Sequence, residues 1–283
     1  MLERMLAHKR AAIERLDLPA LKSMALDSPR PRDFLAALTP HPLARRKTSG
    51  EGGGVAARPG RGVRLIAELK RASPSRGLLA PNIDLPDLAR LYADNGAAAI
   101  SVLTDEKFFL GHLNILRALR FTHHASAPLL RKDFILSPAQ VYETRAAGAD
   151  AVLVIAAALA DIARLADLHA LALGLGLTPL VEVHNLDEVE RVLRLPDLKL
   201  VGINNRDLHT FDVRLETTEE LRPYIPPGIG VVSESGISTA AHVARLAAHG
   251  VYAVLVGEAL VTAPDISAKV RELASFVAVP SVP

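Results

Sequence analysis

The stretch LIAELKRASPSRG, residues 65–77, predicts a buried strand that ends in charged residues and a tight loop. Glu68 and Lys70 stand two residues apart, and alternate residues of a strand lie on the same face. Pro74 then removes a backbone donor and Gly77 permits a sharp turn, so the extended run stops there. In isolation this pattern is more typical of a solvated ion pair on a surface strand. The rest of the chain decides between that interpretation and a site.

A repeat surrounds this stretch. The segments NGAAAI (95–100), AGADAV (147–152) and HGVYAV (249–254) share one signal for a helix end followed by a strand start, and their glycines are 52 and 102 residues apart. These spacings are near two and four units of about 26 residues, the size of one strand plus one helix in a βαβ array. Eight such units would fill the chain from residue 63 to its end.

Apolar, β-rich runs occur where this repeat predicts strands. There are eight of them, at residues 63–69, 97–103, 127–131, 150–156, 178–183, 198–204, 229–234 and 251–257. Amphipathic segments that predict helices lie between and after them, at 85–94, 113–121, 138–146, 162–173, 186–193, 217–224, 239–248 and 264–276. Strands this rich in Val, Ile, Leu and Ala predict a parallel sheet covered by helices. Eight units favour a single α/β domain of the (β/α)8 TIM-barrel class over an open, doubly wound sheet.

The chain before the barrel predicts a helical extension. Apolar residues at near-helical spacing predict a helix over residues 2–16, and Asp33 is placed to cap a second short helix that ends at Leu38. Residues 41–62 are rich in Gly, Arg and Pro without apolar periodicity, which predicts a flexible loop. We therefore divide the chain into an extension with its loop, 1–62, and a catalytic barrel, 63–283.

Composition narrows the class of protein. The chain has no cysteine, which excludes disulfides and thiolate metal sites, and no apolar run approaches membrane-spanning length. Its N-terminus has no apolar signal core, so a cytoplasmic location is expected. Residues 1–64 carry a charge of +7 and the remainder −5, but no aromatic interleaving, zinc spacing or recognition helix accompanies the basic part. Neither a nucleic-acid partner nor a membrane is expected.

Polar residues end five of the eight predicted strands, on the side where barrel enzymes carry their chemistry. They are Glu68 and Lys70, Lys132, Glu182, Asn204 and Arg206, and Glu234 and Ser235. Exposure to solvent does not by itself explain why charged or amide residues end so many strands. The pattern therefore predicts one ring of functional side chains. Clustered lysines and glutamates are also expected to shift one another's pKa values toward neutrality.

The last two strands end in glycine-containing turns. Gly236 follows Ser235, and Gly257 follows the eighth strand. Glycines allow backbone N–H groups to approach an anion, and the loops after strands seven and eight are the usual phosphate site of this fold. We therefore expect a phosphorylated substrate, with Arg206 or Lys70 as a fixed positive charge.

Seven motifs in order resemble the indole-3-glycerol-phosphate synthase family. They are IAELKRASPSRG, SVLTDEKFFLG, LLRKDFI, PLVEVHN, VGINNRDLHTF, VSESGI and VGEAL, between residue 66 and about residue 261. The resemblance implies a cofactor-free lyase of tryptophan biosynthesis that binds no metal. This enzyme closes the indole ring of 1-(2-carboxyphenylamino)-1-deoxyribulose 5-phosphate with loss of CO2 and water.

The resemblance also implies a role for each matched residue. Lys132 would be the general acid at the substrate carbonyl, and Glu182 the base or acid of the later dehydration. Lys70 would contact the substrate carboxylate and share in proton transfer, and Glu68 would orient the lysines. The remaining catalytic positions, Asn204 and Ser235, would hold substrate hydroxyl groups.

The binding residues follow from the same resemblance. Ser73, Arg206, Gly236 and Gly257 would surround the phosphate, together with the neighbouring Glu234 and Glu258. Directly after Gly257 this chain has Glu258 and Ala259, where many members of the family have a serine. Whether the side chain or the backbone contacts phosphate at this position therefore stays open. The apolar pocket for the aromatic ring would be lined by Phe109, Phe134 and Leu208.

Other interpretations stay open at this point. Another phosphosugar barrel, such as phosphoribosylanthranilate isomerase or a pentose-phosphate epimerase, is the enzymatic alternative, and a catalytically silent scaffold is the other. Partnership with separate enzymes of the tryptophan pathway is also open. The isolated histidines, His8, His41, His123, His124, His169 and His249, are expected at the surface, and His184 need not face the substrate.

Overall fold

The structure is a computed structural model that describes residues 1–39, 62–74, 76–122, 126–207 and 210–274. The predicted flexible loop lies outside these residues except for its last position. Leu208, His41, His123 and His124 lie outside them as well. Within the described part of the chain, no helix has the length and apolar character needed to cross a membrane.

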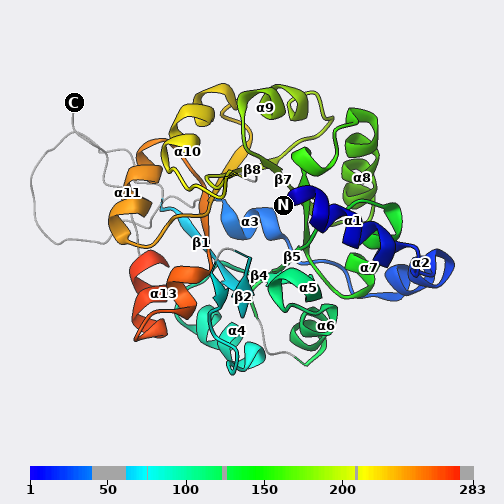
Figure 1. Ribbon diagram of the computed structural model, residues 1–283, viewed down its shortest axis with the longest axis horizontal. Helices are drawn as coiled ribbons and strands as arrows, with labels where there is room; N and C mark the ends of the chain where they lie inside the picture. Colours follow the sequence, from blue (N-terminus) through cyan, green and yellow to red (C-terminus); the bar gives the residue numbers. More distant parts are fainter. Residues whose placement is uncertain (40–61, 75, 123–125, 208–209, 275–283) are drawn as a thin grey trace, which may run out of the picture.

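Eight parallel strands form a closed barrel, as the repeat predicted (Figure 1). The strands are β1 (Arg64–Leu69), β4 (Ala99–Leu103), β5 (Leu129–Lys132), β6 (Ala151–Ile155), β7 (Thr178–Val183), β8 (Leu200–Asn204), β9 (Gly230–Glu234) and β10 (Ala253–Val256). Strand β1 closes the ring, because Ile66 pairs with Ala99 of β4 on one side and with Leu255 of β10 on the other. Each strand falls within a predicted apolar run or extends it by one residue.

Helices surround the barrel (Figure 1). They are α4 (Leu85–Asp94), α6 (Leu113–Phe121), α7 (Pro138–Ala146), α8 (Ile162–Gly174), α9 (Leu186–Val192), α10 (Glu216–Leu221), α11 (Ala240–Ala248) and α13 (Ile266–Ala274). Side-chain caps start several of them: Asp84, Ser137 and Thr239 each accept a hydrogen bond from the backbone N–H three residues later. All eight predicted helices are present.

Short elements in the strand-end loops were not predicted. They are α5 (Glu106–Phe109), α12 (Glu258–Val261), the 3-10 turn Ala156–Ala158, and a hairpin of β2 (Ala72–Ser73) with β3 (Gly77–Leu78). A second 3-10 turn, Arg222–Tyr224, follows α10 directly and lies within the helix predicted at 217–224. The hairpin occupies the loop predicted after the first strand. Segments this short lack a period of their own, and loop contacts determine their conformation.

The extension contains three helices where two were predicted. They are α1 (Leu2–Ile13), α2 (Leu18–Asp27) and α3 (Phe34–Leu38). The missed helix α2 packs against α7. Its start carried a readable signal, because Asp17 accepts a hydrogen bond from the backbone N–H of Ala20, and Pro19 stands in the first turn.

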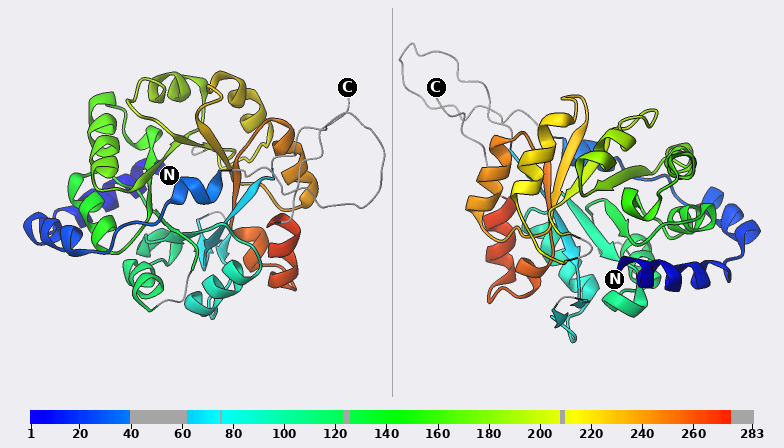
Figure 2. Two further views of the ribbon diagram at one scale, coloured as in Figure 1. Left: turned by 180° about the vertical axis from the view of Figure 1, so that it is seen from behind. Right: turned by 45° about the horizontal axis from the view of Figure 1, so that its top comes forward.

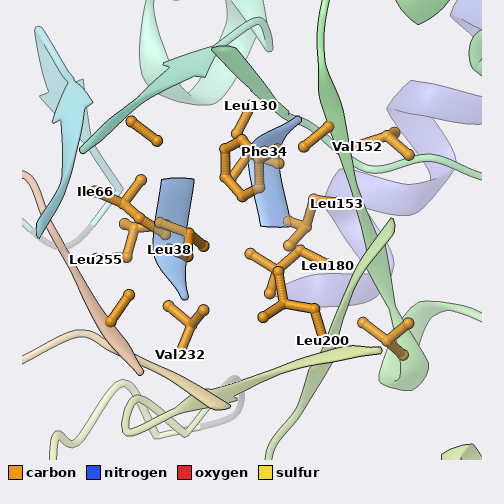
Figure 3. Packing of buried hydrophobic residues seen from close by; sticks show 14 of the residues in the cluster. Phe34, Leu38, Ile66, Leu130, Val152, Leu153, Leu180, Leu200, Val232 and Leu255 are labelled. Atoms are coloured by element: carbon orange, nitrogen blue, oxygen red, sulfur yellow. The ribbon is translucent and has the colours of Figure 1, made fainter. Parts of the chain in front are cut away.

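The extension reaches both ends of the barrel. Phe34 and Leu38 of α3 are fully buried among strand side chains such as Ile66 and Leu255, as Figure 3 shows. The buried Asp150, just before β6, accepts from the backbone N–H of Arg32 at 2.6 Å, which fastens the segment before α3 to the N-terminal end of the strands. The tilted view of Figure 2 places α1 on the opposite side of the strands, at their C-terminal ends.

Candidate active site

One cavity of about 770 Å³ opens at the C-terminal ends of the strands. Every predicted site residue that the structure describes lines it: Glu68, Lys70, Ser73, Phe109, Lys132, Phe134, Glu182, Asn204, Arg206, Glu234, Ser235, Gly236, Gly257 and Glu258. The predicted residue Leu208 lies outside the described residues. Strand ends that are far apart in the sequence therefore bring their polar residues to one place.

Lys132 lies at the centre of a buried charged group that it forms with Glu182 and Glu234. Its Nζ lies 3.1 Å from Oε2 of Glu182 and 3.1 Å from Oε2 of Glu234. Lys70 Nζ lies 3.2 Å from Oε1 of Glu68, so the pair that opens the first motif is also an ion pair. The side chains of all three ion pairs are largely buried. The solvated interpretation of that motif is therefore wrong, since Glu68 is buried in the wall of the cavity.

The charged group separates the pKa values of its two central carboxyls. Burial raises the pKa of Glu182, but the neighbouring Lys132 and His184 outweigh burial and hold this pKa well below its usual range. Burial raises the pKa of Glu234 to about 7, and the charges of Glu182 and Glu68 add to that rise against the opposing effect of Lys132. Burial lowers the pKa of Lys132, but Glu182 and Glu234 outweigh it and keep the pKa above its ordinary value. Of Glu182, Glu234 and Lys132, Glu234 is the group with the expected shift toward neutrality.

Two glycines make room for the carboxylates. A Cβ at Gly202 of β8 would lie 2.3 Å from Oε1 of Glu234, and a Cβ at Gly257 would lie 2.7 Å from Oε1 of Glu68. Gly257, predicted to act at the phosphate, therefore has a second role in accommodating Glu68. Gly202 was missed, although a glycine inside an apolar strand often marks close approach of another group.

The loop after β9 has two successive residues with positive φ. They are Ser235 at 70° and Gly236 at 79°, and this conformation is unusual for a serine. A Cβ at Gly236 would lie 2.4 Å from Val213, so a glycine suits this position for steric as well as conformational reasons. Both residues line the cavity, where the backbone changes direction at the end of β9.

The other predicted phosphate residues are engaged in loop contacts. The Ser73 hydroxyl accepts from the backbone N–H of Arg76 at 3.2 Å, and Arg76 lies 3.2 Å from Glu258. Arg206 donates from Nη1 to the carbonyl of Phe211 at 3.1 Å, while its own N–H donates to Oδ1 of Asn204. These contacts hold the rim of the cavity in shape.

Helix α1 contributes to the site, which the sequence did not reveal. Met1, Leu2 and Met5 line the cavity. Lys9 Nζ lies 2.9 Å from Asp105 and 2.7 Å from Asp133, the residue after Lys132. The helix is thus fastened to the loops after β4 and β5 by a buried cation between two carboxylates.

His169 differs from its predicted surroundings, and His184 does not. His169 of α8 is buried, not exposed, because its helix face packs on the barrel. His184 is absent from the cavity lining, in keeping with the expectation that it need not face the substrate, yet its ring touches Glu182. Among the described residues, no cluster of three or more metal-ligating side chains occurs.

Comparison with known proteins identifies the family. The family model described as indole-3-glycerol phosphate synthase matches residues 54–273. The indole-3-glycerol phosphate synthase of Roseiflexus castenholzii is 51% identical over 96% of this chain and 97% of its own. That of Dehalococcoides mccartyi (strain ATCC BAA-2266 / KCTC 15142 / 195) is 55% identical over 76% of this chain and 82% of its own.

Solved structures agree in fold. The 3-hexulose-6-phosphate synthase of Salmonella typhimurium superposes with a TM-score of 0.58 at 17% identity, covering 75% of this chain and 97% of that one. A mutant tryptophan synthase alpha-subunit from Pyrococcus furiosus gives 0.55 at 18% identity, covering 77% and 100%. At these identities the likeness concerns the barrel alone. The family match over most of the chain goes further, and this chain belongs to the indole-3-glycerol phosphate synthase family.

Proposed function

We propose that the cavity performs the family's reaction through the buried group formed by Lys132, Glu182 and Glu234. The chain is an indole-3-glycerol phosphate synthase, a carboxy-lyase of tryptophan biosynthesis. It converts 1-(2-carboxyphenylamino)-1-deoxy-D-ribulose 5-phosphate into indole-3-glycerol phosphate, CO2 and water. The observation that carries the assignment of roles is the lysine held 3.1 Å from each of two carboxyls. The family match decides against the isomerase and epimerase alternatives.

Lys132 is the acid of ring closure. The aromatic carbon that bears the carboxylate attacks the ketone carbon, and the ketone oxygen takes a proton as the bond forms. A largely buried ammonium group in the cavity wall supplies that proton and stabilises the developing negative charge. Loss of CO2 then returns its bonding electron pair to the ring and restores aromaticity.

Glu182 and Glu234 suit the two proton transfers of dehydration. The hydroxyl on the former ketone carbon leaves as water after it gains a proton, and the adjacent CH2 group loses one. Near neutral pH Glu182 is ionised and able to accept, while Glu234, with a pKa of about 7, still holds a proton to donate. Carboxyls whose environments separate their pKa values form natural base and acid pairs.

The remaining residues anchor the substrate at both ends. Lys70, held by Glu68, binds the substrate carboxylate, and Asn204 and Ser235 hold hydroxyl groups. The phosphate lies against the turns at Ser235–Gly236 and Gly257, with Ser73, Arg206 and the backbone of Glu258 around it. Phe109, Phe134 and Leu208 contact the aromatic ring. Anchoring both ends folds the flexible sugar chain onto the ring and favours closure.

The test is indole formation by the purified protein. With the carboxyphenylamino-deoxyribulose phosphate as substrate, the wild type should produce indole fluorescence. Lys132→Ala should lower kcat by about 10²- to 10⁴-fold, the usual contribution of a positioned acid. Lys199→Ala, an exposed lysine just before β8, is the matched control and should keep wild-type activity. An inactive wild type, or a Lys132→Ala variant as fast as the control, would contradict the proposal.

A further inference from the structure

His184 stands behind the ionised carboxylate of the site. It follows the end of β7 by one residue, and its side chain is only 9% exposed. Its Nε2 lies 3.3 Å from Oε1 of Glu182, and its Nδ1 lies 3.1 Å from Oε2 of Glu188 in α9. The imidazole is therefore placed between two carboxylates, one in the cavity wall and one outside it.

The two oxygens of Glu182 have different partners. Oε2 accepts a hydrogen bond from Lys132 at 3.1 Å, on the cavity side, while Oε1 faces His184. A carboxylate held at both oxygens from opposite sides cannot rotate freely about its last torsion. The contacts thus form one line from Lys132 through Glu182 and His184 to Glu188.

The far end of this line is rigid. Glu188 Oε2 accepts from the backbone N–H of His184 at 2.8 Å, and Glu188 Oε1 accepts from Nδ2 of Asn185 at 3.0 Å. In return the backbone N–H of Glu188 donates to Oδ1 of Asn185 at 2.9 Å, which caps the start of α9. This reciprocal arrangement resembles a capping box and fixes the second carboxylate by backbone as well as side-chain contacts.

We propose that His184 is a positioning residue for Glu182: it holds Oε1 of that carboxylate from behind and so directs Oε2 at Lys132 and the substrate. The ring does not line the cavity, so its effect passes through Glu182. The inference rests on the proposed function, because it concerns the base of the same reaction. It adds a residue outside the substrate-contacting set.

Charge supports this role. Burial lowers the pKa of His184, but the two carboxylates outweigh burial and raise it to about 10, so the ring is an imidazolium at neutral pH. The cations that act on Glu182 are Lys132 from β5 and His184, while the nearby carboxyl of Glu234 from β9 shares Lys132 with it. Lys132 and His184 are therefore the two cations that keep Glu182 ionised. Without the imidazolium, the pKa of Glu182 must rise.

The experiment compares His184→Gln with the wild type from the lowest pH at which both proteins stay folded up to pH 9. Glutamine keeps an N–H donor near the carboxylate but removes the charge. We expect kcat to fall by about tenfold or more, a part of the 10²- to 10⁴-fold contribution of general acid–base catalysis, while KM changes less than about twofold. The acidic limb of the kcat profile should move to higher pH, because Glu182 then takes up a proton more readily. Glu188→Gln should move the limb in the same direction by less.

His169→Gln is the matched control, because this second buried histidine sits on α8 outside the charged group. It should leave the acidic limb in place. A His184→Gln variant with wild-type kcat and an unmoved limb would overturn the inference. So would a variant that loses activity only in step with its melting temperature, since that pattern indicates a structural role.

A second measurement is independent of turnover. The measurement is a pH titration by NMR of protein labelled at histidine with 15N. The signal that disappears in His184→Gln belongs to His184. In the wild type this signal should remain that of an imidazolium above pH 8. Glu182→Gln and Glu188→Gln should each lower its pKa. An imidazole that titrates near its ordinary 6.5 overturns the inference even if the enzyme forms indole. An imidazolium in a protein that forms no indole would instead count against the proposed function alone.

Discussion

Glu234 is buried among charged side chains, and its protonation state changes near neutral pH. Its pKa of about 7 exceeds the ordinary value of 4.5, so the neutral form is held until the pH approaches 7 and is lost above it. If the neutral form donates the proton of dehydration, kcat should fall as the pH rises through about 7. Glu234→Gln should lower kcat and remove this limb, as a pH series of initial rates can measure. Retention of the limb in the variant would assign it to another group.

Gly202 shows how one missing side chain shapes the site. Alanine there would place its Cβ 2.3 Å from Oε1 of Glu234, so either the carboxylate or the strand must move. We expect Gly202→Ala to destabilise the fold by about 1–3 kcal/mol, the usual cost of overpacking, and to lower kcat more than it raises KM. Urea unfolding and steady-state kinetics check both effects. Gly228→Ala, whose Cβ would meet nothing within 4 Å, is the control and should do neither.

At the scale of elements, helix α1 is joined to the site by one buried lysine. Lys9→Met would leave Asp105 and Asp133 without their shared cation, and breaking a buried pair in this way costs about 3–5 kcal/mol. Because Met1, Leu2 and Met5 of the same helix line the cavity, we also expect a raised KM. Thermal unfolding and substrate saturation curves measure the two effects. Lys199→Met, at an exposed lysine just before β8, should change neither, and an unchanged KM in Lys9→Met would show that α1 does not shape the binding site.

Different strands and loops contribute different parts of the site. The turn after β9 forms part of the cavity wall, β5 and β7 provide the Lys132–Glu182 pair, and the start of α9 supports His184. Each element supplies one part, and the parallel barrel places all of them at the same end because every strand runs in one direction.

At the scale of the whole molecule, the extension is fastened to both ends of the barrel. Phe34 of α3 is fully buried among strand side chains (Figure 3), while α1 lies at the catalytic end. We therefore propose that the extension, 1–62, and the barrel, 63–283, unfold together. Phe34→Ala should lower the free energy of unfolding by about 3–5 kcal/mol, as for other buried aromatic truncations, within a single transition. Calorimetry checks this. Leu26→Ala, at a site 77% exposed, is the control, and two separated transitions would contradict the proposal.

The sequence by itself determined the barrel and the membership of its polar ring. Strand and helix periods are local, so the eight apolar runs and the residues that end them, from Glu68 to Ser235, could be located without coordinates. The missed helix α2 has 10 residues, as many as the predicted α4, and its cap at Asp17 was the available signal.

The tertiary structure alone decided which charges meet. Lys132 and Glu182 are 50 residues apart, and Lys9 reaches Asp133 from a helix outside the barrel. The space that Gly202 leaves for Glu234 and the contact of His184 with Glu182 also depend on where neighbouring elements lie. Electrostatic energy depends on distance and burial, and neither is a property of sequence order. For that reason the sequence identified the ionisable residues of the site, whereas only the fold set the opposite pKa shifts of Glu182 and Glu234.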